Sequence, residues 1–231
     1  MAEENVSITY YLSRTAKKNV NIVIKDDGLV HVSAPRYVSI DEINRIVYSK
    51  KDWIIKTQKN LKEKKIVHSN SIIESGSIIY FYGNPYILKI IPSVSNSIKT
   101  DGNVFLFYVK KDHLNDQNYL RNELNKNLKK ELTKTVTKCI QNYLELTSLS
   151  LDSIDVRVMK SRWGTCIPSK KKIIMNFNLI YCPMESIEYV ALHEVTHLLH
   201  PNHSKRFYES IAMYMPDWKE RKNLLKNYAI L

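Results

Sequence analysis

Residues 183–203 read PMESIEYVALHEVTHLLHPNH, and this stretch decides how the second half of the chain is interpreted. Pro183 suits the first turn of a helix, where its missing N–H needs no partner. His200 precedes Pro201, and the residue before a proline is pushed out of the α region. The sequence therefore predicts a helix over about 184–200 that carries an H-E-x-x-H motif near its end.

Within this helix, His193 and His197 lie four residues apart, so both imidazoles share one face and can bind the same metal ion. A bound Zn²⁺ would lower the pKa of a water molecule towards neutrality. Glu194, beside the first histidine, would then take the proton of this water as general base and later return it to the leaving amine. We therefore expect a zinc-dependent hydrolase. Imidazole ligands accept several divalent ions, so Zn²⁺ is an inference from the motif.

A catalytic zinc site needs a third protein ligand and one open position. His200 lies on the same face, but seven residues at ~1.5 Å each place it roughly 10 Å from His193 along the helix axis. His203 lies beyond the break at Pro201, where a turn can bring its imidazole back towards the pair. We therefore expect His203 as the third ligand. Three carboxylates downstream are competing candidates: Glu209, Asp217 and Glu220.

An alternative interpretation is that these histidines are surface residues near the C-terminal end of a helix, where the dipole favours positive charge. This would explain one or two histidines but not Glu194 between them. The group that stabilises the oxyanion is open, with Tyr208, Arg162 and Tyr214 as candidates by residue type.

The second half of the chain is also predicted to hold further helices and a short sheet. Leucines and other apolar residues spaced mostly by four indicate a long helix over 115–146. Strand-like runs at 154–159 and 173–177 indicate an antiparallel sheet. Two more helices are expected at about 204–214 and 217–228.

The first half is predicted to be mostly sheet, with one helix. Ser39 and Glu42 form a capping box at the start of a helix that runs to about Lys64. Turn signals separate three pairs of strands, at 20–24 and 29–34, at 78–82 and 86–91, and at 97–100 and 104–109. We expect an α+β fold, with a small β-rich N-terminal lobe (1–110) on a zincin-like catalytic lobe (111–231), the two forming one compact unit.

Composition points to a folded protein in the cytoplasm. Of 231 residues, 44% are hydrophobic and 25% charged, which excludes disordered and fibrous classes. No apolar run reaches the ~20 residues of a membrane span, and the first residues are acidic, unlike an export signal. Cys139, Cys166 and Cys182 are widely spaced without a C-x-x-C pair, so we expect reduced thiols.

The chain carries a net charge of +12, from 35 Lys and Arg against 23 Asp and Glu. Such a surface would attract a polyanion, and weak association with nucleic acid is one expectation. The alternative is that the lysines only solvate helix faces, because charge alone says little about function.

Five segments carry a resemblance to a known family: APR at 34–36, KDWI at 51–54, SRWGTC at 161–166, HEVTHLLHPNHSKRF at 193–207 and DWKER at 217–221. They resemble the bacterial YgjP-like zinc metallopeptidases, which are relatives of the WLM and SprT-like peptidases. The resemblance covers about residues 15–225. It implies a zinc-dependent hydrolase whose ligands correspond to His193, His197 and His203, with Glu194 catalytic.

The segment SRWGTC is expected on a strand shortly before the metal helix. An extended peptide can add to a sheet edge, so Arg162 or Trp163 would line the substrate cleft, and Tyr208 is a further candidate for substrate contact. The alternative is that Trp163 packs in the core, Gly164 permits a close approach and Cys166 is a small buried residue.

Three functions are compatible with these features. The leading one is a metallopeptidase that acts on peptides or proteins. The second keeps the metal site but hydrolyses a nucleotide phosphoanhydride, which the basic surface would suit, although no Gly-rich phosphate loop supports it. The third is a nucleic-acid-associated protein with a structural zinc, which would need a fourth ligand that the sequence does not offer.

Overall fold

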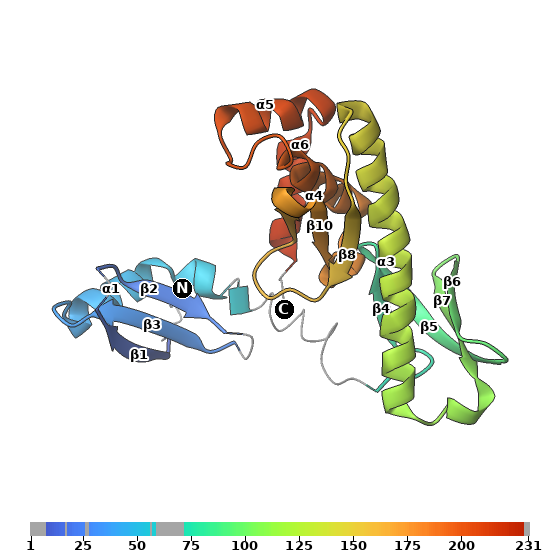
Figure 1. Cartoon of the computed structure of the whole chain (residues 1–231). Helices are drawn as coiled ribbons and strands as arrows, with labels where there is room; N and C mark the ends of the chain where they lie inside the picture. The colour runs from blue at the N-terminus through green and yellow to red at the C-terminus, as the bar shows by residue number, and fades with distance from the viewer. Residues whose placement is uncertain (1–7, 17, 26–27, 56, 59–71, 229–231) are drawn as a thin grey trace. The chain divides into compact units, whose positions relative to one another are not determined.

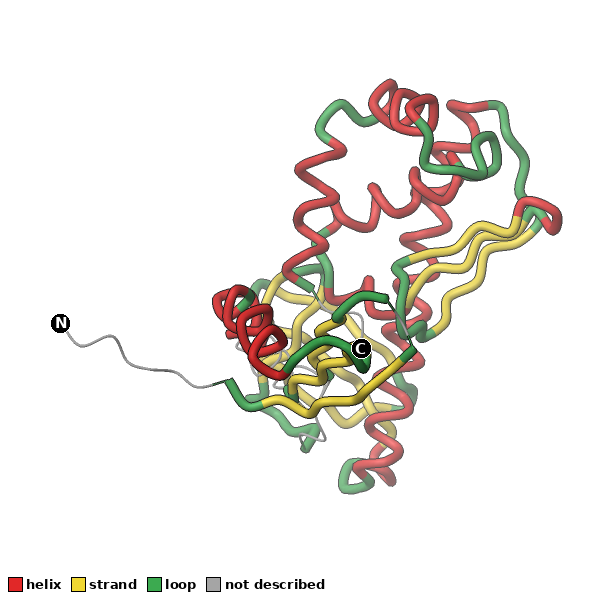
Figure 2. Tube along the Cα trace, turned by 90° about the vertical axis from the view of Figure 1, so that its left-hand side faces the viewer, coloured by secondary structure: helices red, strands yellow, loops and turns green. Residues whose placement is uncertain are grey.

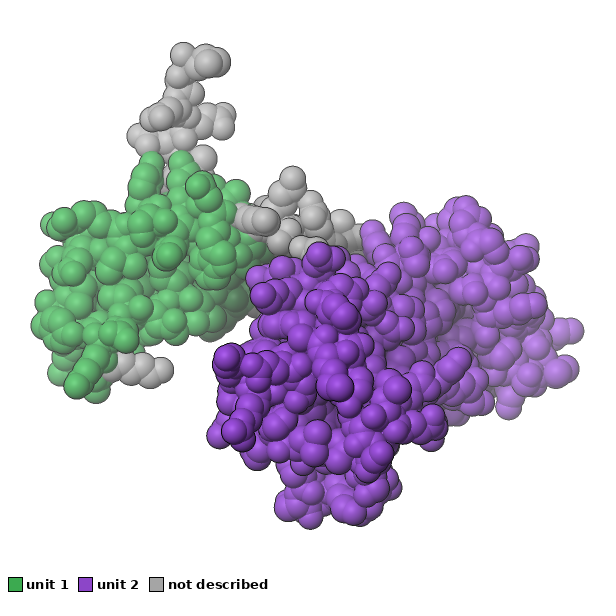
Figure 3. All heavy atoms as spheres, turned by 90° about the horizontal axis from the view of Figure 1, so that it is seen from above, with its two compact units in different colours: residues 1–69 green, residues 70–231 purple. Residues whose placement is uncertain are grey.

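A computed structural model describes residues 8–16, 18–25, 28–55, 57–58 and 72–228. Helices and strands both contribute to the fold, which confirms the predicted α+β class (Figures 1 and 2). The chain divides into two compact units, residues 1–69 and 70–231, coloured separately in Figure 3. No helix in the described ranges combines the length and the apolar character that a membrane span needs.

The first unit is a three-stranded sheet with a helix. Strands β1 (Tyr10–Thr15), β2 (Asn21–Ile24) and β3 (Val30–Pro35) have the order β1-β3-β2, with β3 parallel to β1 and antiparallel to β2. Alternate residues of β3 are buried, as expected for a strand with one face on a core. They pack with Ile43 and Val47 of helix α1 (Ile40–Ser49).

Helix α1 begins as predicted but ends earlier. The Ser39 side chain accepts a hydrogen bond from the Glu42 backbone N–H, which confirms the N-terminal cap. The prediction of one helix to about Lys64 is wrong, because α1 ends at Ser49 and Lys50 leaves the helical conformation before helical residues resume at 51–55. The apolar spacing is similar in both segments, so it does not reveal this break. Residues 59–64 lie outside the described residues.

The second unit begins with a four-stranded sheet of order β4-β5-β7-β6. Its strands are β4 (Ile78–Phe81), β5 (Asn84–Ser93), β6 (Ser97–Asp101) and β7 (Val104–Lys110). Both predicted hairpins are present, and β5 and β7 pair in parallel to join them.

This sheet belongs with the C-terminal part of the chain, so the division differs from the expected boundary near residue 110. The backbone N–H of Tyr82 donates to the carbonyl of Ile180 (2.8 Å), and the Tyr82 and Thr135 hydroxyls form a hydrogen bond (2.6 Å). Between β4 and β5, Gly83 has a φ of +81°, and a Cβ there would lie 3.0 Å from Pro183. The turn between β4 and β5 thus contacts residues of the C-terminal half directly.

Helix α3 (Gln117–Thr147) is a long helix whose buried face belongs to the core of this unit (Figure 1). The Asp116 carboxylate accepts hydrogen bonds from the Asn118 and Tyr119 N–H groups and caps the start of the helix. Ser148, with a φ of +53°, ends it in the left-handed conformation. The predicted apolar stripe is the buried face: Leu120, Leu124, Leu128, Leu132, Val136, Cys139 and Ile140.

A second sheet has the order β8-β10-β9, from β8 (Ser153–Arg157), β9 (Gly164–Ile167) and β10 (Lys172–Asn176). The prediction of an antiparallel sheet is wrong for one pair, because β10 is antiparallel to β9 but parallel to β8. The short turn 168–170 forces β9 and β10 into a hairpin, and residues 158–163 carry the chain from β8 to the far side of β10. β9 is therefore an edge strand.

Three helices complete the unit: α4 (Met184–Thr196), α5 (Lys205–Tyr214) and α6 (Trp218–Leu224). α4 is buried along most of its length and packs between α3 and the β8-β10-β9 sheet. Arg221 of α6 forms an ion pair with Glu188 of α4 and a hydrogen bond of 2.8 Å with Asp217. This pairing ties α6 to the helix that carries the H-E-x-x-H motif.

Leu132→Ala tests the role of α3 in the core. Leu132 is fully buried, so we expect a loss of about 2–5 kcal/mol in the free energy of unfolding, measured by chemical denaturation. Lys130→Ala on the exposed face of the same helix is the control and should change it by less than about 0.5 kcal/mol. Equal effects of the two substitutions would contradict this packing.

Candidate metal centre

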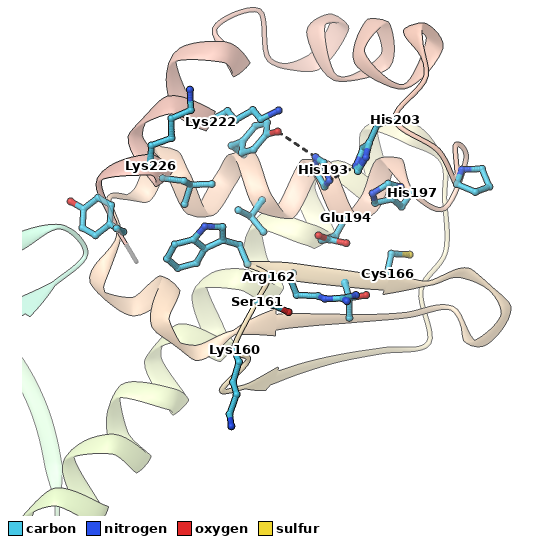
Figure 4. A pocket seen from close by; sticks show the side chains of 18 of the residues that line it. Lys160, Ser161, Arg162, Cys166, His193, Glu194, His197, His203, Lys222 and Lys226 are labelled. Atoms are coloured by element: carbon cyan, nitrogen blue, oxygen red, sulfur yellow. Dashed lines mark hydrogen bonds between the residues drawn. The ribbon is translucent and has the colours of Figure 1, made fainter. Parts of the chain in front are cut away.

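Three histidines from two segments converge at the end of α4. Ligand-type atoms of His193, His197 and His203 all lie within 4.8 Å of one another. Nε2 of His193 and Nε2 of His203 are 3.0 Å apart (Figure 4). The side chain of Phe207, fully buried on α5, contacts all three rings at centroid distances of 4.7–4.9 Å. The imidazoles therefore share one apolar support.

The convergence depends on where α4 ends. The predicted end at His200 is wrong by four residues, because α4 ends at Thr196, and His197 is its C-cap. Tighter turns follow, with Leu198 N–H donating to the Val195 carbonyl (3.0 Å). The turns continue only to His200, whose N–H donates to the Thr196 carbonyl (2.9 Å), so His203 can fold back towards His197 within a short segment. Ser204 then caps α5 by accepting a hydrogen bond from the Phe207 N–H.

The hydrogen bonds of two rings leave Nε2 as the nitrogen that faces the centre. His197 Nδ1 lies 3.0 Å from the carbonyl oxygen of His200, and since a carbonyl only accepts, Nδ1 carries the proton. His193 Nδ1 lies 3.3 Å from the Tyr189 hydroxyl. Such contacts fix the tautomer and orientation of metal-binding histidines.

Burial favours the neutral imidazoles that metal binding requires. It is the main cause that lowers the pKa of His193 to about 3, with smaller effects from the neighbouring His197 and His203. Burial also lowers the pKa of His203, followed by the charges of His197 and Lys222. A neutral imidazole presents a lone pair to a cation, so the electrostatics of the site suit a metal ion.

Glu194 lies between α4 and strand β9 (Figure 4). Burial raises the pKa of its carboxyl to about 7, while the Cys166 backbone and the Arg162 charge act in the opposite direction. Its Oε2 atom is buried and has no hydrogen-bond partner among the described residues. A buried carboxyl oxygen without a partner is costly and is explained by a ligand or water that completes the site.

Gly164, the first residue of β9, makes this position of Glu194 possible. A Cβ at Gly164 would lie 2.6 Å from Glu194 Oε1 and 2.7 Å from its Cγ, closer than real Cβ contacts. The close approach considered for Gly164 is therefore a contact with the motif glutamate. Only glycine leaves room for the carboxylate between the helix and the strand.

An aromatic cluster holds the histidines from the side opposite β9. Tyr189, Trp218 and Tyr208 stack in sequence, with centroid distances of 6.5 Å and 4.9 Å. Tyr208 also stacks against His203 at 6.2 Å. The cluster joins α4, α5 and α6 and connects the surroundings of His193 with those of His203.

A pocket of about 1000 Å³ opens beside the histidines. Arg162 and Trp163 line it, but from the loop before β9 rather than from the strand, which begins at Gly164. The buried side chain of Asn176 holds this loop by donating to the carbonyls of Met159 (2.8 Å) and Arg162 (2.9 Å). The pocket thus runs along β9 and past the face of α4 that carries His193 and His197.

The other sequence candidates lie elsewhere. Glu209 pairs with Lys205 (3.6 Å) and Asp217 bonds to Arg221, and neither these carboxylates nor Glu220 joins the histidine cluster in the described part of the chain. His200 Nε2 lies 3.1 Å from the Ser210 hydroxyl. Tyr208 stacks on His203, and neither it nor Tyr214 is among the residues that line the pocket.

The donor set fits a zinc ion. Three imidazoles converge, and Zn²⁺ commonly takes histidine nitrogens at about 2.0–2.1 Å. The exposure of His203 and the pocket beside it leave the site accessible for a further, non-protein ligand. Three protein ligands with one open position are the arrangement of catalytic rather than structural zinc.

Sequence reasoning missed several residues of this site. Tyr189 could have been found, because it lies four residues before His193 on the same helix. Asn176 and Lys222 give no local signal, since their contacts with the site depend on how distant elements pack.

A family model described as "YgjP-like, metallopeptidase domain" matches residues 18–228. No curated protein matches the sequence. Among solved structures, the metallopeptidase zymogen jannalysin of Methanocaldococcus jannaschii is 19% identical to this chain, with a TM-score of 0.35. The match covers 38% of this chain and 90% of that one, and a similarity this low carries no argument.

His203→Ala tests the third ligand. We expect the affinity for Zn²⁺, measured by competition with a chelator, to fall by at least about tenfold, because one of three nitrogen donors is lost. His200→Ala is the matched control and should leave the affinity within about twofold, since that ring bonds to Ser210. An unchanged affinity of the His203 variant would contradict the assignment.

Proposed function

The chain belongs to the YgjP-like metallopeptidase family, as the resemblance in its sequence suggested, and we propose that it is a zinc-dependent peptidase that hydrolyses peptide bonds at the centre described above. The observation that carries this proposal is the convergence of His193, His197 and His203 next to the buried Glu194 carboxylate. Metal ligands and a proton acceptor in one pocket are what metal-assisted hydrolysis requires.

The chemistry divides between the ion and the protein. When bound by the three imidazoles, Zn²⁺ would supply Lewis acidity for a water molecule and for the scissile carbonyl. Glu194 accepts the proton of the attacking water and returns it to the leaving amine. Its pKa of about 7 suits both directions of transfer, because a general base works best near the ambient pH.

Strand β9 is the element best placed to orient a peptide substrate. It pairs only with β10 among the described strands, so its other edge offers backbone N–H and C=O groups, apart from the Cys166 backbone group that bonds to Glu194. Residues 164–166 line the pocket next to Glu194. An extended peptide that adds to this edge would pass the metal-binding face of α4. Arg162 and Trp163 would contact such a substrate, and Arg162 remains a candidate for oxyanion stabilisation.

Two other functions, nucleotide hydrolysis and nucleic-acid association, place different requirements on this site. A nucleotide phosphoanhydride hydrolase would use the same centre, and the basic side chains around the pocket favour it as the second candidate. A nucleic-acid-associated protein with structural zinc would need four protein ligands, and the described residues bring three together. A cytoplasmic location and weak nucleic-acid association through the basic surface stay predictions.

Glu194→Gln tests the general base. The amide has the same shape but cannot accept the proton, so we expect peptide turnover to fall by at least about 10²-fold with zinc still bound. Glu185→Gln, the same change at an exposed position of α4, is the control and should retain turnover. Mass spectrometry of the products measures peptide turnover, and the metal content of each variant shows whether zinc is bound. Loss of zinc from the Glu194→Gln variant would contradict this role and show that Glu194 is a metal ligand.

Gly164→Ala tests the contact between β9 and Glu194. The added Cβ would overlap the carboxylate, so Glu194 or the strand must shift. A misplacement of about 1 Å at a reacting group can cost about 10²-fold in rate. We therefore expect kcat to fall by about 10–100-fold, with zinc content unchanged. Retention of full kcat would show that the position of Glu194 is not critical.

A further inference from the structure

The pocket beside the histidines is lined by more cationic than anionic side chains. Its cations are Lys160, Arg162, Lys222 and Lys226, and its one carboxylate is Glu194. Lys160 extends away from the histidines in Figure 4, whereas Lys222 lies on their side of the pocket. Even without Lys160, positive charge dominates the surface that a substrate meets. Such a pocket attracts anionic groups.

Lys222 is held against the aromatic cluster at the pocket wall. Its Nζ lies 5.5 Å from the ring centroid of Tyr208 and 5.8 Å from that of Trp218, within the range of cation–π contacts. The same two rings support His203 through the Tyr208 stack. These contacts place the ammonium group at the pocket that the histidines also line.

The acidic side chains of the neighbourhood are engaged elsewhere. Arg221, the residue before Lys222, forms ion pairs with both Asp217 (2.8 Å) and Glu188. Within the described ranges, Lys222 forms no ion pair with a protein carboxylate. The charge of Lys222 is thus available to a bound ligand.

We propose that Lys222 forms a carboxylate-binding subsite beside the metal centre, so that the enzyme prefers peptides with a carboxylate close to the scissile bond. The inference rests on the proposed peptidase function and adds the substrate class. Lys226, four residues later, lines the same pocket and provides a second cation. The carboxylate comes from an acidic side chain or from the C-terminus of the peptide, because an ammonium group binds either in the same way.

The substrate arm of the test uses the zinc-loaded wild-type protein. Peptides of one backbone sequence carry Glu or Gln at each position near the scissile bond, with a free or an amidated C-terminus. We expect KM to be at least about tenfold lower for the peptide that offers the carboxylate, with a smaller change in kcat. The Glu/Gln arm and the free/amidated arm show which of the two sources supplies the group.

The protein arm compares two lysines that contact the same tryptophan. Lys222→Gln should remove the preference, and Lys222→Arg should largely restore it because the charge returns. Lys219→Gln is the matched control: its Nζ lies 5.7 Å from the Trp218 ring, but Lys219 is exposed and does not line the pocket. It should keep the preference. Circular dichroism checks folding. If a Lys222 variant does not fold, the wild-type comparison of peptides still shows whether a carboxylate is preferred, and its absence would overturn the subsite.

Binding to the zinc-loaded Glu194→Gln protein gives a readout that does not depend on turnover. Calorimetry should show at least about tenfold tighter binding of the carboxylate peptide than of its neutral partner, and Lys222→Gln in this background should abolish the difference. Peptide hydrolysis without any carboxylate preference would overturn the subsite and leave the peptidase function intact.

Binding of carboxylate peptides without hydrolysis would separate the subsite proposal from the peptidase proposal. If no peptide is hydrolysed but carboxylate peptides still bind in a Lys222-dependent way, the peptidase function fails and the subsite stands. A nucleoside triphosphate could instead bind more tightly than any carboxylate peptide, in a way that depends on Lys222. That result would overturn the carboxylate assignment and show that the pocket binds phosphate groups.

Discussion

Two histidines four residues apart on a helix face the same way, but a third ligand for one ion cannot come from the next turn of that helix. The proposed metal centre therefore depends on α4 ending within the motif. Thr196 is its last residue, and the carbonyl of His200, in the turn that follows, accepts from the His197 ring. This turn directs the chain back, so that His203 reaches His193 and Phe207 packs beneath all three rings.

A second constraint acts from the opposite side of the site. Glu194 is buried because β9 lies against α4, and at Gly164 an added Cβ would overlap the Glu194 side chain. The same burial raises the pKa of the carboxyl and leaves one oxygen without a partner among the described residues. Strand β9, helix α4 and the aromatic cluster thus surround the proposed site. Lys222 adds a positive charge to the lining of its pocket.

The sequence predicted those elements whose pattern is local. The stripe of α3 and the cap of α1 are examples, because spacing and capping residues determine them. Strand β1 was missed, since most of Tyr10–Thr15 is exposed and shows no alternation of buried and exposed residues. The parallel pairing of β8 with β10 and the attachment of the β4–β7 sheet to α3 depend on contacts distant in sequence. At the site, the histidine motif is visible in the sequence, whereas the Gly164–Glu194 contact arises only from tertiary packing.

X-ray absorption at the zinc edge tests the central claim most directly. On the zinc-loaded full chain, we predict a first shell of three imidazole nitrogens at about 2.0–2.1 Å and one further light ligand, with no sulfur. Cys166 lines the pocket near Glu194 and is the sulfur ligand to exclude, although burial raises the pKa of its thiol to about 11 and so disfavours the thiolate. A shell that includes sulfur at about 2.3 Å, or four imidazoles, would contradict a catalytic centre formed by His193, His197 and His203.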